Sequence, residues 1–295
     1  MPRALRFSLL LLGVACRPSP APQSGALVDD AGVATTIAAP PRRVVSLIPA
    51  TTELLFALGA GDRLVGRTTW CDYPAEATRV PDLGNGIQPN IEAVLAARPD
   101  LVLLYRSGAN GDAAGRFRAL GVPTLELATD RIADLTRITR LLGRALGVPE
   151  AADSLVARTE RDLAAATTPS VGPSVRPSVF ILVWDRPPMT LGAGSFLSEI
   201  VERAGARNLF GDLPTSSAQI SIEAVAARDP DFVLSSSAED PAIAGRPEWR
   251  VVPAVRERRF LKIHGSEFNR PSPRVGQAVR ELAAALAAAQ AQRRP

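Results

Sequence analysis

Apolar residues along the chain form short continuous runs and longer stretches with helical spacing, and one segment that combines the two occurs twice. It reads IEAVLAARPDLVL from Ile91 to Leu103 and IEAVAARDPDFVL from Ile222 to Leu234. The copies share Ile, Glu, Ala, Val, Ala, Pro, Asp, Val and Leu, nine of thirteen positions. Each copy predicts a short helix, stopped by a proline, and then a buried strand. Because about 130 residues separate the copies, more than the period of a stacked array, the repeat predicts two similar lobes. Chance recurrence of a common helix-to-strand step is the alternative.

The first lobe is expected to begin with a strand from Arg43 to Ile48. Thr51 or Thr52 is expected to cap the helix that follows. A second strand from Leu64 leads to a polar and aromatic segment around Trp70. Loops that follow parallel strands gather at one edge of the sheet, so these segments are expected to form a ligand-facing rim.

Two long helices are predicted between the lobes, from Ile132 to Leu146 and from Pro149 to about Ala166. The second would be about 27 Å long at 1.5 Å per residue, enough to cross between lobes. The predicted organisation is a first lobe over residues 40–148, a linking helix over 149–168, a surface loop over 169–177 and a second lobe over 178–295. In the second lobe Ser195 is expected to cap a helix, and an Ala-rich helix from Val275 is expected to end it.

The first forty residues are typical of an export signal and a tether. Arg3 and Arg6 precede an apolar run from Phe7 to Ala15 that is too short to span a bilayer, so residues 1–15 are predicted to be a signal peptide. Leu12 to Cys16 resembles a bacterial lipoprotein signal, which predicts lipidation of Cys16; a cleaved and released protein is the alternative. Residues 16–39 are predicted to be a flexible spacer.

Composition and motifs argue against several functions. The 295 residues carry a net charge of only +4 despite a pI near 9.8, and no Lys/Arg-rich run indicates nucleic-acid binding. The sequence lacks the motifs of serine hydrolases, dinucleotide binders and P-loop proteins, as well as Cys/His metal spacing, so neither an enzyme nor a catalytic cofactor is expected. A thiol enzyme built on Cys71 and His264, or a metal-trafficking protein, would be a less favoured alternative.

Four segments in order carry a family resemblance: SLIPATTELLFALG from Ser46, CDYP from Cys71, the two IEAV repeats, and NRPSPR from Asn269. Together they resemble the substrate-binding proteins of bacterial ABC importers, in the helical-backbone class that takes cobalamin, ferric siderophores or haem, and are most similar to the periplasmic cobalamin-binding proteins. The resemblance implies α/β architecture with two Rossmann-like α/β lobes joined by a single long α-helix and a ligand cleft between them. It implies cobalamin or a related corrinoid as the transported ligand, with a ferric siderophore or haem as the alternative.

The resemblance also implies a set of ligand-binding residues: Trp70, Tyr105, Trp184, Phe268 and Arg270. The first three follow apolar strands, at the end where open parallel sheets bind ligands. Aromatic rings suit a large flat ligand, and an arginine suits a phosphate or an amide edge. The loop from Gly84 to Gln88 has no aromatic residue, which predicts a pocket that is more open than in the nearest relatives or that suits another corrinoid.

Glu92 and Glu223 hold the second position of the two repeats, early in equivalent helices. A carboxylate is stabilised there by the helix N-terminus, which accounts for both residues without a partner. The resemblance implies a further role, because in this family glutamates at these positions form salt bridges to arginines of the membrane permease dimer. The sequence therefore predicts an extracytoplasmic monomer that docks on a permease and meets the membrane only through a lipid anchor.

Overall fold

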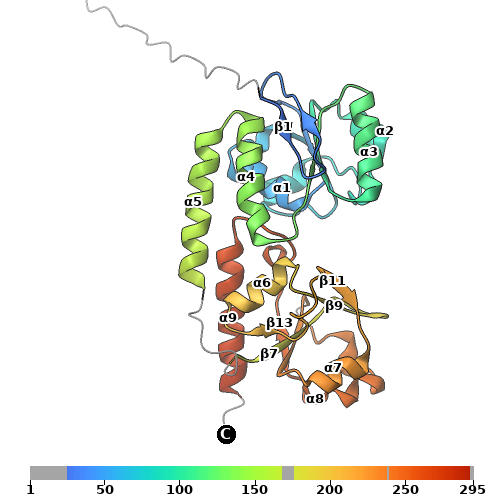
Figure 1. Ribbon diagram of the computed structural model, residues 1–295, viewed down its shortest axis with the longest axis vertical. Coiled ribbons are helices and arrows are strands. Elements are labelled where there is room, and N and C mark those ends of the chain that lie inside the picture. The colour runs from blue at the N-terminus through green and yellow to red at the C-terminus, as the bar shows by residue number, and fades with distance from the viewer. Residues whose placement is uncertain (1–24, 168–175, 238, 293–295) are drawn as a thin grey trace, which may run out of the picture.

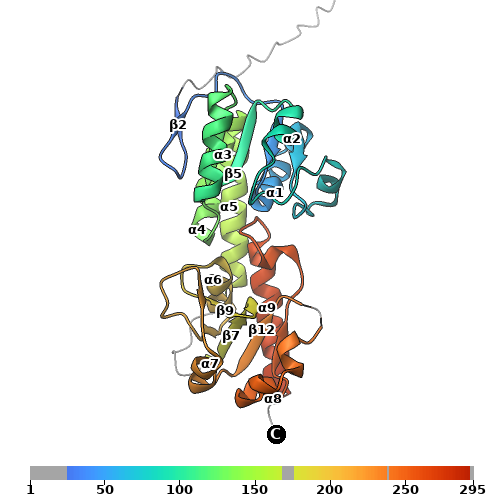
Figure 2. The ribbon, with the colours of Figure 1, turned by 90° about the vertical axis from the view of Figure 1, so that its right-hand side faces the viewer.

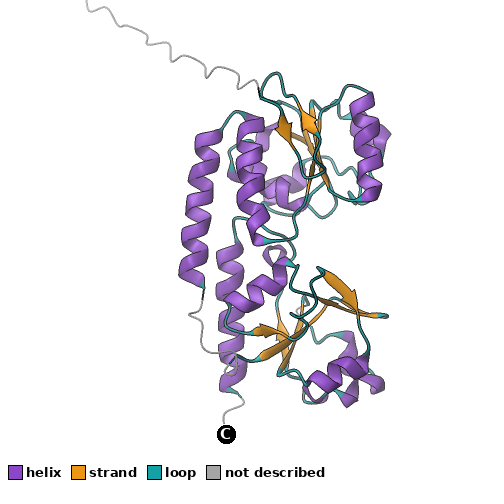
Figure 3. Ribbon diagram, in the orientation of Figure 1, coloured by secondary structure: helices purple, strands orange, loops and turns teal. Residues whose placement is uncertain are grey.

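The computed structural model describes residues 25–167, 176–237 and 239–292. Each of the two lobes contains a four-stranded parallel sheet with helices on both faces (Figures 1 and 3). The first lobe has strands β3 (Val44–Ser46), β4 (Leu64–Arg67), β5 (Leu101–Tyr105) and β6 (Thr124–Leu127), in the order β4-β3-β5-β6. The second has β7 (Ser178–Leu182), β10 (Arg207–Asn208), β12 (Phe232–Ser235) and β13 (Phe260–Lys262), in the order β10-β7-β12-β13. The lobes therefore share one topology.

The repeated segment occupies the same place in both lobes, which confirms the helix-to-strand prediction. Helix α2 (Ile91–Ala96) leads into β5, and helix α7 (Ile222–Arg228) leads into β12. Each of these strands is flanked on both sides by parallel neighbours. The helix starts also match, because the side chains of Asn90 and Ser221 each accept a hydrogen bond from a backbone N–H three residues on.

Alternating residues of the strands face two different layers of helices. In the first lobe Val44, Leu101 and Leu103 join a core that includes α1 (Pro49–Ala57) and α4 (Ile132–Leu146). Val45 and Val102 point the other way, toward α2 and α3 (Gly108–Ala119). Burial on both faces explains why these strands read as continuous apolar runs.

One long helix, α5 (Pro149–Ala166), lies beside both lobes on one side of the molecule. It lies against α4 of the first lobe and against α9 (Val275–Ala291) of the second (Figures 1 and 2). Gly276 allows α9 to approach closely, since a Cβ there would collide with Asp162 of α5. One apolar core runs through α4, α5 and α9, so the lobes share a common buried surface on this side.

The remaining elements are short. The second lobe adds α6 (Phe196–Arg203), α8 (Pro253–Arg256) and an antiparallel sheet of β8 (Trp184–Asp185), β9 (Pro188–Leu191) and β11 (Ser217–Gln219). Single 3₁₀ turns cover Gly61–Arg63, Ala75–Arg79, Ala242–Gly245, Pro247–Val251 and Ser266–Phe268.

The structure corrects the prediction of a flexible spacer over its last part, because residues from Leu27 to Thr35 form a hairpin. Strand β1 (Leu27–Val28) pairs with β2 (Ala34–Thr35), and Leu27 is buried in the core. The hairpin is joined to β6, since Asp29 accepts a hydrogen bond from the Glu126 N–H and Thr35 donates to the Thr124 carbonyl. The predicted signal peptide and Cys16 lie outside the described residues.

The predicted cap of the first helix is also wrong. Helix α1 begins at Pro49 with Ile48 as its N-cap, and Thr51 and Thr52 lie inside the helix, fully buried. Their hydroxyls instead hydrogen-bond to Ser46, at distances of 2.7 and 2.9 Å. Proline fits the first turn because its missing N–H is not needed there, so the helix starts earlier than the threonines suggest.

Candidate functional site

The first lobe contains a hollow of about 650 Å³ at the carboxyl ends of its strands. Its walls come from loops that follow β3, β4, β5 and β6, and from the segment before α9 of the second lobe. The lining residues are Leu47, Ile48, Pro49, Ala50, Trp70, Asp72, Asn85, Gly86, Ile87, Tyr105, Ser107, Asn110, Thr129, Ser266, Asn269 and Arg270. This is where open parallel sheets bind ligands, so the predicted rim is confirmed as the wall of a cavity.

A second hollow of about 410 Å³ lies against the second lobe. It is lined by residues that follow β7 and β12, by β9, and by the start of α6, with Phe268 and Pro271 from the segment before α9. Thr129 and Asn269 line both hollows. The two hollows therefore meet and form one cleft between the lobes.

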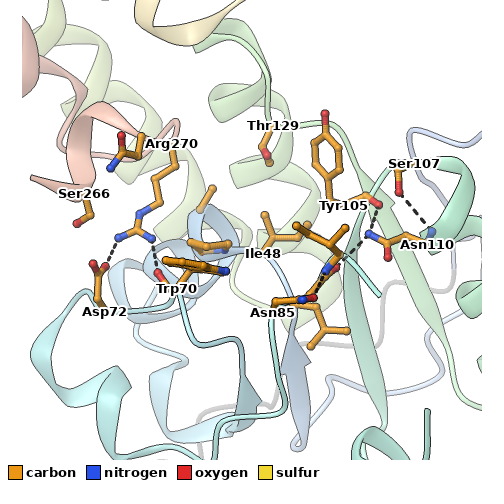
Figure 4. A pocket seen from close by; sticks show the side chains of 16 residues that line it. Ile48, Trp70, Asp72, Asn85, Tyr105, Ser107, Asn110, Thr129, Ser266 and Arg270 are labelled. Atoms are coloured by element: carbon orange, nitrogen blue, oxygen red, sulfur yellow. Dashed lines mark hydrogen bonds and ion pairs between the residues drawn. The ribbon is translucent and has the colours of Figure 1, made fainter. Parts of the chain in front are cut away.

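Trp70 and Tyr105 lie on two sides of the first hollow, with Ile48 between them (Figure 4). The Trp70 side chain is 61% exposed, which is unusual for the largest apolar residue and leaves its ring free for a ligand. Both residues stand where the sequence places cleft-lining aromatics. A flat molecule in this hollow would meet ring surface from two sides.

Trp184 and Phe268 take different positions from the first pair. Among the described residues that line the two hollows, Trp184 is absent; it lies in β8, 60% exposed, and its indole N–H donates to the Arg186 carbonyl at 2.8 Å. Phe268 is only 2% exposed and belongs to the shared core, although one part of it lines the second hollow. The structure thus places Phe268 as both a core residue and a wall of the cleft.

Arg270 lines the first hollow, but protein groups hold all three of its guanidinium nitrogens. Its Nε donates to Glu53 at 2.7 Å, one Nη donates to the Trp70 carbonyl at 2.7 Å, and the other donates to Asp72. The side chain of Glu53 is 2% exposed and that of Arg270 is 8% exposed. Arg270 is therefore fixed as part of the wall, and its charge is balanced before any ligand arrives.

Arg274 completes this network across the lobes. It donates to both carboxylate oxygens of Glu53, at 3.0 and 2.7 Å, pairs with Glu267, and lies 3.8 Å above the Tyr73 ring. Burial alone would lower the pKa of Arg274, but the hydrogen bonds and charges of Glu53 and Glu267 together outweigh it and hold the pKa above its usual range. Glu53 belongs to α1 of the first lobe, so this buried network joins it to the segment that enters α9.

Tyr105 has a polar contact at the junction of the hollows. Its hydroxyl donates to Asp130 at 2.7 Å. Burial, followed by this hydrogen bond, raises the pKa of Tyr105 to about 12, so the phenol stays neutral and acts as a donor at physiological pH. Asp130, which accepts this hydrogen bond, lines the second hollow.

The loop around Gly86 forms part of the first hollow without an aromatic side chain. Gly86 has φ +75°, and a Cβ there would lie 2.5 Å from the Leu47 carbonyl oxygen and 2.7 Å from Thr68 Cγ2. Ile87 beside it is 67% exposed and lines the hollow. Sequence reasoning missed Ile87, Asp72 and Asp130. Asp72 had a signal, since it stands two residues after Trp70, whereas Asp130 had none.

Cys71 and His264 lie in contrasting environments. Cys71 is buried, with its sulfur 3.0 Å from the Thr52 hydroxyl and 3.2 Å from that of Thr68, while His264 is exposed. Within residues 25–167, 176–237 and 239–292, no group of three or more His, Cys, Asp or Glu side chains is placed to hold a metal ion. Within the same residues, no helix is long and apolar enough to cross a membrane.

Glu92 and Glu223 are exposed in the first turns of α2 and α7. Both helices lie on the side of the molecule opposite α5 (Figure 1). The backbone N–H of Glu223 and then the Ser221 hydroxyl hold the pKa of the Glu223 carboxyl below its usual range. The two carboxylates thus lie on the surface at matching positions of the two lobes.

Comparison with known proteins gives consistent results. The periplasmic binding protein family model matches residues 44–266. An uncharacterized ABC transporter substrate-binding lipoprotein, YvrC of Bacillus subtilis, is 30% identical over 267 residues, covering 88% of this chain and 84% of its own. The periplasmic vitamin B12 binding protein BtuF of Vibrio cholerae is similar in structure, with a TM-score of 0.69 and 26% identity over 85% of this chain and 98% of its own. The periplasmic haem-binding protein RhuT of Roseiflexus sp. RS-1, in apo form, has a TM-score of 0.74 and 26% identity over 84% and 98%.

Proposed function

The chain belongs to the periplasmic binding protein family, and from that premise we propose that it binds cobalamin or a related corrinoid and delivers it to the permease of an ABC importer. Family membership confirms the resemblance seen in the sequence and the predicted extracytoplasmic location. The family consists of transport proteins that bind substrates, which agrees with the absence of catalytic motifs from the sequence.

The observation that carries the corrinoid proposal is the wall of the first hollow. Trp70, Tyr105, Ile48 and Ile87 offer apolar and aromatic surface, and uncharged polar side chains such as Asn85 stand among them. A corrinoid has a flat apolar ring with an edge of amide groups, so it needs this combination of surfaces. Stacking on rigid aromatic rings costs little side-chain entropy, which favours tight binding.

Haem or a ferric siderophore is the second candidate ligand. It is favoured by the similarity to the Roseiflexus haem-binding protein, because a porphyrin would also stack on Trp70 and Tyr105. A metal-trafficking protein and a thiol enzyme are less well supported. The cleft offers the acids Asp72 and Asp130 and no histidine among its described lining residues, and Cys71 is buried whereas His264 is exposed.

Titration calorimetry of the mature protein distinguishes these ligands. We expect cyanocobalamin to bind at one site, and both haem and a ferric trihydroxamate to bind at least tenfold more weakly or not at all. Tryptophan fluorescence should fall on binding, because Trp70 faces the first hollow. If haem or the hydroxamate binds clearly and cyanocobalamin shows no detectable binding, the second candidate is the ligand.

Two further parts of the proposal concern the membrane. We propose that Cys16 is lipidated, which intact-mass measurement of the protein from membranes would test. We also propose that Glu92 and Glu223 dock on two basic residues of a permease dimer, supported by their exposure at equivalent places on both lobes.

A further inference from the structure

The charges that line the cleft are unevenly balanced. Among the described residues of both hollows, Asp72 and Asp130 carry negative charge and Arg270 alone carries positive charge. Arg270 belongs to a network with Arg274 in which the two guanidinium groups are already matched by Glu53, Glu267 and Asp72, three acids to two bases. A ligand that enters the cleft therefore meets carboxylates and finds no uncommitted cation on its walls.

The surroundings of the cleft do not restore the balance. Arg106 is exposed just beyond Tyr105, and Asp134 nearby is paired with Arg137 at 2.9 Å. Arg131, on the same loop as Asp130, is paired with Glu199 at 2.8 Å. Of these groups Arg106 is the one cation that could offset Asp130, and it is not among the residues that line the two hollows.

The other polar groups on the walls are uncharged. The first hollow presents Asn85, Ser107, Asn110, Thr129, Ser266 and Asn269, and the second presents Ser195, Ser216, Ser217 and Ser236. Amide and hydroxyl groups can pair with amides of a ligand by donating and accepting. They cannot neutralise a ligand carboxylate, which would lose its hydration without gaining a counter-charge.

We propose that the cleft selects corrinoids by the charge of their edge, accepting side chains that are neutral amides and rejecting free carboxylates, with Asp72 and Asp130 as the specificity-determining residues. This inference rests on the proposed corrinoid function. It separates amide-edged corrinoids from acidic biosynthetic precursors of the same ring. It also disfavours haem, whose two propionates would face the same carboxylates.

The test compares two ligands that differ by one charge. Cyanocobalamin and its monocarboxylic acids, in which one side-chain amide is hydrolysed, are titrated into the mature protein. A ligand carboxylate about 7 Å from a cleft carboxylate, at an effective dielectric constant of about 40, would be repelled enough to weaken binding of the acids about five- to tenfold at low salt. At about 1 M NaCl, where the screening length is about 3 Å, most of this difference should disappear.

Two cleft variants and one control test the residues. Asp72→Asn and Asp130→Asn keep an oxygen that can accept from Arg270 or Tyr105. In each variant the ratio of cyanocobalamin affinity to acid affinity should fall by at least about threefold from its value in the unchanged protein. Asp153→Asn on the outer face of α5 makes the same charge change far from the cleft and should alter neither ligand.

The outcomes separate this inference from the function beneath it. The corrinoid function stands if cyanocobalamin binds tightly. The charge selection is overturned if, in addition, the monocarboxylic acids bind equally well at low salt, or if their loss of affinity is unchanged in both cleft variants. Failure of every corrinoid to bind would overturn both.

Discussion

Loss of the Glu53 carboxylate should destabilise the whole molecule, because this one group joins the two lobes through two arginines. It accepts three hydrogen bonds, from Arg270 Nε and from Nε and one Nη of Arg274, at 2.7 to 3.0 Å. Its side chain is 2% exposed and those of the arginines are 8% and 14% exposed, so water can replace little of what is lost. In Glu53→Gln, an amide N–H₂ would face a guanidinium. Breaking one partner of such a buried pair costs about 3–5 kcal/mol.

Thermal unfolding followed by calorimetry measures this cost. A chain of this length shifts its melting temperature by about 2–3 °C per kcal/mol, so Glu53→Gln should melt about 6–15 °C below the unchanged protein. The matched control is Glu92→Gln, which removes an exposed carboxylate and should stay within about 0.5 kcal/mol. If Glu53→Gln melts within 2 °C of the control, the network does not hold the lobes together as argued.

Three further outcomes follow from the site. Trp70→Ala should weaken corrinoid binding by about 1–3 kcal/mol. Trp184 lies outside both hollows, so Trp184→Ala should weaken binding by less than about 0.5 kcal/mol. If calorimetry shows the reverse order, the ligand lies on the β8 side. Glu92→Arg combined with Glu223→Arg should preserve ligand affinity but abolish ligand delivery in vesicles that contain the permease, and each single variant should show intermediate transport. Full transport by the double variant would mean that both residues act only as charges that stabilise the starts of their helices. In Tyr73→Phe, which leaves Tyr105 as the last tyrosine, ultraviolet titration of the phenol should give a midpoint near 12. The raised pKa of Tyr105 stabilises the fold fully below about pH 10 and less as the pH rises toward 12. A midpoint near 10 would contradict the burial of Tyr105 and its contact with Asp130.

The sequence predicted the parts of the fold that local patterns determine. Apolar runs located the central strands, and the bounds of α4 and α5 agree with the spacing of their apolar residues and with Pro149. The hairpin from Leu27 to Thr35 was missed because its surroundings are rich in Ala, Pro and Gly, and because its stability comes from Glu126 and Thr124, about ninety residues away. Distant partners of this kind leave no local signal.

The same limit applies to the site. Tyr105 and Trp70 could be placed because Tyr105 ends a strand of a parallel sheet and Trp70 follows one, positions that the topology brings to the cleft. The state of Arg270 could not be predicted, because its partner Glu53 lies 217 positions earlier in the chain. An arginine in isolation suggests contact with an anion of the ligand, whereas here its charge is used inside the protein.

If Cys16 is lipidated as proposed, the hairpin at the start of the first lobe also limits how far the protein can move from the membrane. With residues 16–39 as a free spacer, a lipid on Cys16 would allow the lobe roughly 80 Å of travel, at a maximum of about 3.5 Å per residue. Because Leu27 and Asp29 are held against the lobe, the chain between a lipid on Cys16 and the first described residue would span at most roughly 30 Å, at the same maximum length per residue. A lipid on Cys16 would therefore keep the cleft in a thin layer above the bilayer, and confinement to so small a volume would raise the local concentration of the loaded protein at any permease nearby.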